Sequence, residues 1–271
     1  MTVRTPITAQ QERDNDLWLS KVPQATAVFW LVKILATTVG ETGGDALSMT
    51  LKLGYAVATL IFLVFFVVTL AVQVRSRSYH PAAYWAVVIA TTTVGTTTSD
   101  FLDRTVGLGY VVSSALLLLA VLVVLAIWRA VAGRIEYDRI VRPRDEVFYW
   151  VTILVSNTLG TALGDFAADN AGLGFERGAL VFAALLLVVA LVWRLARRVP
   201  VGVLFWAAYV LTRPLGATLG DSLTKPVADG GLNLNRISAS LAILAAMAVV
   251  VVIQHVSGRD NRRAAVSSSA R

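Results

Sequence analysis

One spacing occurs four times along this chain and constrains its fold more than any other feature. A tryptophan is followed ten residues later by a glycine, and that glycine five residues later by an aspartate. The four sets are Trp30–Gly40–Asp45, Trp85–Gly95–Asp100, Trp150–Gly160–Asp165 and Trp206–Gly216–Asp221. Recurrence at a fixed spacing indicates four copies of one structural unit, which stack against each other rather than fold alone.

The copies lie in apolar sequence that is typical of membrane-spanning helices. The chain has 271 residues, of which 56% are hydrophobic and only 15% charged, whereas soluble domains have about 25% charged residues. Segments such as 56–74 and 111–128 carry no charge, and with their flanks they approach the ~20 residues that cross a bilayer. We therefore predict an all-α, polytopic membrane protein. The absence of cysteine excludes disulfides and thiolate metal sites.

Each copy predicts two helices, which gives eight transmembrane helices in four parallel repeats. The expected spans are 27–48, 54–75, 82–102, 109–130, 147–167, 174–194, 202–223 and 232–254. The expected organisation is a tail at 1–26, repeats at 27–76, 82–130, 147–195 and 202–255, a charged loop at 131–146 and a disordered tail at 256–271. Parallel copies imply internal pseudo-symmetry about an axis along the membrane normal. A pseudo-fourfold arrangement and two halves of two repeats both satisfy this pattern.

Basic residues predict the orientation. Of the 24 lysines and arginines, 17 lie between the repeats or in the tails, five lie in the short connections within repeats, and two lie in apolar stretches. Loops rich in Lys and Arg stay in the cytoplasm, so both termini are expected there. The net charge of +7 then follows from topology, and no nucleic-acid partner is needed to explain it.

A polar face runs along the first helix of each repeat, because residues four apart share one side of a helix. The four stripes are Lys33, Thr37, Glu41 and Asp45; Val88, Thr92, Thr96 and Asp100; Ile153, Asn157, Thr161 and Asp165; and Tyr209, Arg213, Ala217 and Asp221. Lipid cannot satisfy such faces, so the stripes are expected to turn inward together.

Where the stripes meet, the sequence predicts a site for a proton or a hard cation. The candidate ligands are Glu41, Asp45, Asp100, Asp165 and Asp221, with Thr37, Thr92, Thr96, Asn157, Thr161 and Arg213 in support. Oxygen ligands alone suit hard cations rather than zinc or copper. No catalytic residue and no cofactor other than such a cation is predicted. The competing interpretation is that each aspartate is a solvated helix end at the outer interface.

Some residues occur in one copy only or mark the helix ends. Glu41 and Arg213 lie at neighbouring depths, which predicts an ion pair of Arg213 with Glu41 or with an aspartate. Lys33 is expected to extend to the cytoplasmic surface, and Trp128 and Trp193 to lie in an interfacial belt.

The glycine of each set begins a small-xxx-small pair, for example Gly40 with Gly44, which predicts close helix packing.

These copies resemble a known family. Thr37-Thr38-Val39-Gly40-Glu41-Thr42, the segment 158–165 and the segment 212–218 are similar to bacterial membrane proteins built from four tandem copies of a tryptophan-bearing, two-helix repeat of unknown function. The resemblance covers roughly residues 27–255. It implies eight spans in the bacterial inner membrane and implies no activity.

The sequence favours a transporter or channel for protons or a hard cation, which passes between the first helices of the repeats. The alternatives are a non-transporting scaffold or assembly protein, which predicts a dry and fully paired core, and, less favoured, an intramembrane aspartyl enzyme that uses two of the aspartates. The expected partners are the lipid bilayer and a small cation or proton, and a homo-oligomer stays open.

Overall fold

The protein is an all-α bundle. A computed structural model describes residues 20–76, 78–135, 140–196 and 198–269, with side chains described as far as Val256. The helices are α2 (Ala27–Asp45), α3 (Gly54–Arg75), α4 (Pro81–Asp100), α5 (Tyr110–Ala132), α6 (Pro143–Asp165), α7 (Gly174–Leu195), α8 (Val201–Thr224) and α9 (Arg236–Ser269). Short π-helical turns η1 (Ala46–Thr50), η2 (Phe101–Thr105) and η3 (Phe166–Asn170) follow α2, α4 and α6, and the 3₁₀ turn η4 (Val227–Asp229) follows α8.

Two predicted segments differ from the structure. The charged loop expected at 131–146 is shorter, because Pro143 begins α6 and a proline is well suited to the first turn of a helix. Asp145 and Glu146 then lie in that first turn, where their negative charges interact favourably with the positive end of the helix dipole. The tail expected to be disordered from residue 256 is instead helical as far as Ser269.

The first helices of the four sets form a closed ring. In this ring α2 packs on α4, α4 on α6, α6 on α8, and α8 on α2. We call α2, α4, α6 and α8 the inner helices and α3, α5, α7 and α9 the outer helices. The inner helices begin near their tryptophans and end near their aspartates, so the ring has a tryptophan end and an aspartate end.

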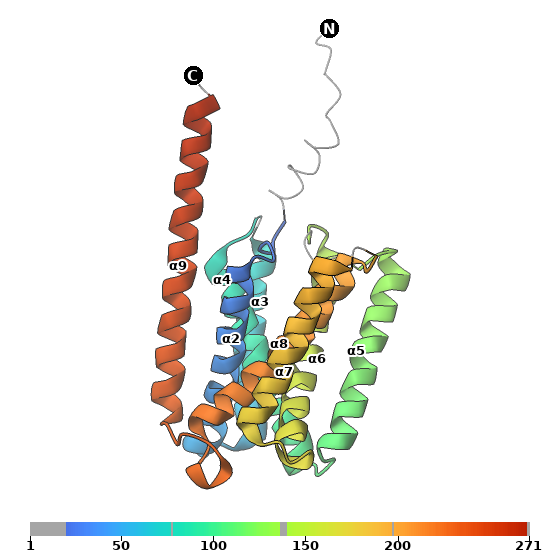
Figure 1. Cartoon of the computed structure of the whole chain (residues 1–271), viewed down its shortest axis with the longest axis vertical. Helices are drawn as coiled ribbons and strands as arrows, with labels where there is room; N and C mark the ends of the chain where they lie inside the picture. The colour runs from blue at the N-terminus through green and yellow to red at the C-terminus, as the bar shows by residue number, and fades with distance from the viewer. Residues whose placement is uncertain (1–19, 77, 136–139, 197, 270–271) are drawn as a thin grey trace.

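Each outer helix packs mainly on the inner helix of the following repeat. Helix α3 packs on α4, α5 on α6 and α7 on α8, and α9 closes the circle by packing on α2. The first three of these pairs are joined directly by a loop, whereas the fourth joins the two ends of the described chain (Figure 1). The repeats therefore interlock, and no repeat buries its own two helices against each other as a unit.

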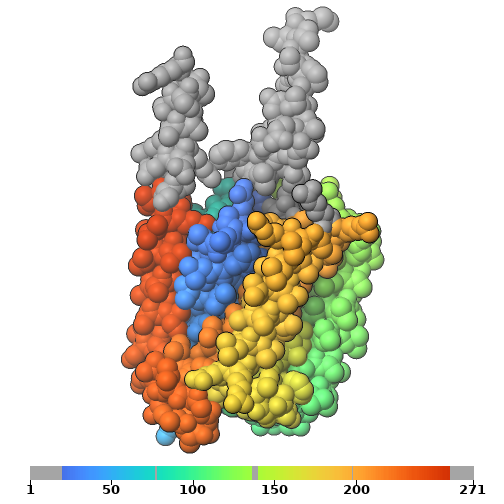
Figure 2. Space-filling model, in the orientation of Figure 1, coloured from blue at the N-terminus to red at the C-terminus, as the bar shows by residue number. Residues whose placement is uncertain are grey.

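The outer helices expose apolar side chains along most of their length. Leu60 and Leu119 are 63% and 58% exposed, and Leu187 is 60% exposed. Six helices of the described chain are long and apolar enough to cross a membrane, namely all four outer helices together with α6 and α8. Part of α2 also reaches the surface between α9 and α7 (Figure 2). Leu31 of this helix is 49% exposed. These surfaces are those of a multi-pass membrane protein.

The glycines at the ring contacts explain how the inner helices approach so closely. A Cβ added to Gly40 would collide with Thr92, and one added to Gly216 would collide with Thr37. At Gly95 an added Cβ would lie 2.9 Å from the backbone carbonyl carbon of Asn157. At each of these glycines, the missing side chain leaves room for a residue of the next inner helix in the ring. The predicted packing seams are confirmed.

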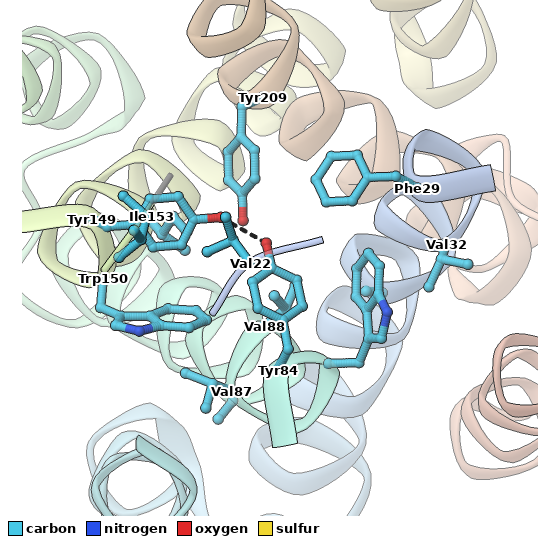
Figure 3. Packing of buried hydrophobic residues seen from close by; sticks show 14 of the residues in the cluster. Val22, Phe29, Val32, Tyr84, Val87, Val88, Tyr149, Trp150, Ile153 and Tyr209 are labelled. Carbon is cyan, nitrogen blue, oxygen red and sulfur yellow. Dashed lines mark hydrogen bonds between the residues drawn. The ribbon is translucent and has the colours of Figure 1, made fainter. Parts of the chain in front are cut away.

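A buried aromatic layer fills the tryptophan end. The residue before each tryptophan of the ring is aromatic, and it contacts the tryptophan of the next repeat: Phe29 with Trp85, Tyr84 with Trp150, Tyr149 with Trp206, and Phe205 with Trp30, at centroid distances of 5.5–5.8 Å. Figure 3 shows part of this layer, with the hydroxyl groups of Tyr84, Tyr149 and Tyr209 directed toward one another. Trp128 also belongs to it, since it is fully buried and stacks on Phe148. The prediction of an interfacial position for Trp128 is therefore wrong, whereas Trp193 is 63% exposed.

Candidate functional site

The ring turns the four polar stripes inward. All the predicted site residues are buried, with at most 2% of their surface exposed: Glu41, Asp45, Asp100, Asp165, Asp221, Thr37, Thr92, Thr96, Asn157, Thr161 and Arg213. The interpretation of the aspartates as solvated helix ends is therefore wrong. Although α2, α4 and α6 do end at these aspartates, the π-helical turns that follow keep the chain packed over them.

An ion pair occupies the centre of the ring. The Arg213 Nη2 group lies 2.9 Å from Glu41 Oε2, and both side chains are nearly inaccessible. The same Nη2 group lies 2.6 Å from the hydroxyl oxygens of Thr96 and Thr161. Arg213 thus reaches from α8 to α2, α4 and α6, and of its two predicted partners, Glu41 or an aspartate, the structure has Glu41. Its Nε and Nη1 groups have no hydrogen-bond partner among the described residues.

Lys33 lies nearer the tryptophan end and does not reach the surface. Its side chain is fully buried, and its Nζ atom lies 4.3 Å from the centre of the Tyr209 ring. Its hydrogen-bond acceptor is Asn157 Oδ1 at 3.5 Å, and the Asn157 amide donates in turn to Thr91 Oγ1 at 3.0 Å. The expectation that Lys33 extends to the cytoplasmic surface is wrong, because its stripe faces the ring axis and the aromatic layer covers the end of the ring.

Thr37 and Thr92 lie in the helix seams and do not contact the carboxylates. The Thr92 hydroxyl lies 3.2 Å from the carbonyl oxygen of Ala36, and the Thr37 hydroxyl 3.2 Å from that of Thr212. Both also lie within hydrogen-bond distance of carbonyl oxygens of their own helices. Their role in the described structure is helix packing, as expected for hydroxyl groups on helices.

At the aspartate end, the four carboxylates are bridged in pairs by basic side chains. The Lys225 Nζ atom lies 3.2 Å from Asp45 Oδ2 and 3.3 Å from Asp221 Oδ1. Arg104 lies 3.1 Å from Asp100 Oδ1 and 3.6 Å from Asp165 Oδ2. Arg236 approaches Asp45 Oδ2 as well, at 3.4 Å. Each bridge joins carboxylates of two repeats, so the charges also hold the ring together.

Three of the carboxylates could share one cation. Glu41, Asp45 and Asp221 each offer an oxygen, and these oxygens lie within 4.8 Å of one another. Asp45 Oδ1 is buried and accepts no hydrogen bond from the described residues. The remaining two aspartates, Asp100 and Asp165, belong to the Arg104 bridge instead. The structure thus divides the predicted site into a group of three carboxylates and a separate pair.

Both bridging cations remain protonated. Burial acts to lower the pKa of Lys225, but the carboxylates of Asp221 and Asp45 together outweigh it and raise the pKa above the ordinary lysine value. At Arg104 burial likewise acts against the charge, and Asp100 and Asp165 raise the pKa beyond the ordinary arginine value. Neither residue appears among the sequence candidates. The available signal is that Arg104 and Lys225 each follow an aspartate by four residues, the spacing of helical ion pairs.

An open depression lies at the aspartate end, beside the bridged carboxylates. Its volume is about 380 Å³, and its polar lining consists of Arg104, Lys225, Asp169 and Asp229. Arg104 and Lys225 belong both to this lining and to the carboxylate bridges, so they form the boundary between the depression and the buried site. We call this depression the vestibule.

Described residues cover the tryptophan end of the ring. Val22, which precedes α2, is 6% exposed and lies among Tyr84, Tyr149 and Tyr209 (Figure 3). Lys21 fixes this segment, because its Nζ atom lies 2.8 Å from Glu146 Oε2 and its backbone N–H donates to the carbonyl oxygen of Ile140 at 3.2 Å. Of the two ends of the ring, the aspartate end thus has the vestibule beside its bridged carboxylates, whereas the described residues of the tryptophan end are packed over the ring.

Comparison with known families gives one match. The family model described as Repeat of Unknown Function (DUF347) matches residues 28–79, 83–133, 148–199 and 204–260. A search of curated proteins and a search of solved structures found no match. Each matched segment covers most of one inner helix and of the outer helix that follows it, so the resemblance inferred from the sequence is confirmed.

Proposed function

The chain belongs to the Repeat of Unknown Function (DUF347) family, and from the geometry of its site we propose that it transports protons or a hard cation across a membrane. One observation carries this proposal. The ammonium group of Lys225 lies between the carboxylates of Asp45 and Asp221, at 3.2 and 3.3 Å, with Glu41 close by. The position between these carboxylates would suit a bound cation, and in this structure the ammonium group of Lys225 occupies it.

Lys225 also lies at the route of entry, because it lines the vestibule. When its side chain moves toward the vestibule, it frees oxygens of Asp45 and Asp221 for a proton or a cation. Carboxylate oxygens are ligands that both accept. Among the residues that the structure describes, the four aspartates form ion pairs with three basic side chains, Arg104, Lys225 and Arg236. The unbalanced negative charge belongs to Asp100 and Asp165, which in the described chain share Arg104 alone, and it favours uptake of one positive charge at the aspartate end.

We further propose eight spans, with the tryptophan end in the cytoplasm of a bacterial inner membrane. Helices α2 and α4 are the two inner helices that fall outside the candidate spans, and their threonines and charges lower their mean hydropathy because they face the ring. Loops rich in Arg at the tryptophan end support this orientation. The cyclic packing supports pseudo-symmetry about an axis along the membrane normal. Transport would then alternate between an open vestibule and an open tryptophan end.

The test is flux in proteoliposomes. Asp221→Asn and Asp45→Asn should each abolish proton flux or cation-dependent flux, whereas Glu176→Gln, which changes an exposed carboxylate, should leave it unchanged. Size-exclusion profiles would show that each variant remains folded. Wild-type flux that survives in both aspartate variants would refute the proposal.

A second candidate is a non-transporting scaffold, and one observation favours it. Arg213 is fully buried and Glu41 is almost fully buried, and the helix seams around them are closely packed. A protein of this kind would show no flux with any ion, while the same aspartate variants would lose stability or assembly. The flux assay therefore separates the two candidates. An aspartyl enzyme is disfavoured because each close aspartate pair is bridged by a cation instead of sharing a proton.

A further inference from the structure

The charges around Lys33 do not balance. The centre of the ring contains Lys33 and Arg213, and in the described part of the chain the carboxylate at their level is Glu41, which pairs with Arg213. Among the described residues no carboxylate forms an ion pair with Lys33, whose side chain is fully buried. Asp45 lies twelve residues further along α2, about 18 Å along the helix axis. A second full positive charge here would be uncompensated, which is costly in a buried, membrane-enclosed site.

The helices packed around α2 offer no other counter-charge. The titratable side chains of α4 are Tyr84 and Asp100, which lie near its two ends. Helix α8 contributes Tyr209, whose ring lies against Lys33, followed by Arg213 and then Asp221 at the aspartate end. Helix α9 carries no titratable residue between Arg236 and His255. From α6, the neighbour of Lys33 is the neutral Asn157.

The other repeats show that the fold does not require a charge at this position. The residues equivalent to Lys33, twelve positions before each aspartate, are Val88, Ile153 and Tyr209. Val88 and Ile153 are fully buried in the same ring. An aliphatic side chain therefore satisfies the packing, and the amine of Lys33 must be explained by something other than packing.

We propose that Lys33 is uncharged in this closed form of the protein and is the group on the cytoplasmic side that takes up and releases a proton. An amine desolvated beside an existing cation favours its neutral form. The neutral amine still fits its surroundings, since it can donate to Asn157 Oδ1 and lie against the Tyr209 ring. When the tryptophan end opens, water reaches the amine and allows it to bind a proton. The neutrality of Lys33 is independent of transport, whereas its role as the coupling group rests on the proposed function.

Nuclear magnetic resonance of lysine side chains tests this directly, because the chain has only four lysines, Lys21, Lys33, Lys52 and Lys225. With ¹⁵Nζ-lysine labelling of the full chain in micelles, one of the four signals should be that of a neutral amine at pH 8. An ordinary lysine, with a pKa of about 10.4, is protonated at that pH. Lys33→Met should remove this signal. If that variant does not fold, Lys21→Arg, Lys52→Arg and Lys225→Met assign the signal by elimination, since these are the other three lysines. Four ammonium signals up to pH 9 would overturn the proposal.

A stability measurement provides an independent check and tests the opposite assignment. If Lys33 is neutral, Lys33→Met should unfold at a temperature close to that of the wild type, whereas Lys33→Arg, which cannot lose its charge, should unfold at a lower temperature. The opposite order, together with a loss of stability when chloride is replaced by gluconate, would mean that a charged Lys33 holds an anion. That result would also overturn the proposal. Neither measurement uses flux, so failure of the transport assay would leave the assignment of Lys33 unaffected.

Discussion

Arg213 and Glu41 are 172 positions apart in the chain, yet the guanidinium Nη2 of one lies 2.9 Å from the carboxylate Oε2 of the other at the centre of the ring. The pair joins the first inner helix to the last. It therefore closes the ring by electrostatics in the same place where α8 and α2 close it by packing.

Breaking this pair from one side should be costly. Glu41→Thr alone leaves the buried guanidinium without its carboxylate, and we expect a loss of about 3–5 kcal/mol in the free energy of unfolding. The double variant Glu41→Thr with Arg213→Thr installs the residues that repeat 2 has at these positions, Thr96 and Thr92, and should regain most of that stability. Denaturant unfolding in detergent measures both. Equal losses in the single and double variants would contradict the role given to the pair.

The seam glycines should tolerate no side chain. Gly95→Ala places a Cβ 2.9 Å from the backbone of Asn157, and overpacking of this kind costs about 1–3 kcal/mol. Gly43→Ala is the matched control, because it lies in α2 but would meet its nearest neighbour at 3.9 Å. The control should keep or raise the melting temperature, since alanine favours a helix more than glycine does. The prediction fails if both variants melt alike.

Removing the internal cation should make the site responsive to added cations. Lys225→Met leaves Asp45 and Asp221 without their bridging ammonium group, so added Mg²⁺, Ca²⁺ or Na⁺ should raise its melting temperature more than that of the wild type. Lys52→Met, which changes an exposed lysine of the same end, serves as the control. A thermal shift that is the same in all three proteins would remove the argument that Lys225 stands in for a transported cation.

The contribution of Lys225 to stability should persist over a wide pH range. Its pKa is raised above the ordinary value of 10.5 in the folded protein. A group of this kind contributes fully below its unfolded pKa and loses its contribution only as the pH rises through the folded pKa. The stability difference between wild type and Lys225→Met should therefore be constant from pH 6 to pH 9. A decline within that range would show that Lys225 deprotonates more easily than its two carboxylates allow.

Cysteine labelling can test the orientation, because the natural chain has no cysteine. Asp169→Cys lies in the vestibule and Arg198→Cys in the loop at the tryptophan end, and both positions are exposed. A membrane-impermeant thiol reagent added to intact cells should label position 169 only. Cells that are broken open should expose position 198 as well. Labelling of position 198 in intact cells would reverse the proposed topology.

The recurring set of tryptophan, glycine and aspartate was enough to predict the helices and the inward face. A period of four residues along a helix defines one face whatever its neighbours are, and a polar face in an apolar segment must turn away from lipid. Glu41 and Arg213 each occur in one copy and lie at neighbouring depths, which predicted a pair of Arg213 with Glu41 or with an aspartate. Arg104 and Lys225 were counted only as charges in the connections, because their partners depend on how the turns fold back over the ring.

Periodicity and hydropathy are local properties, so helices α2 to α9, their repeat and the polar stripes could be predicted from the sequence alone. Only the tertiary structure decided which helices are neighbours: each outer helix lies on the inner helix of the next repeat, and α9 reaches α2 to complete the circle. It also decided that Lys33 stays buried and that Lys225 lies between two aspartates. Such contacts join residues far apart in the chain, and their energies depend on close packing and exclusion of water, which no single segment specifies.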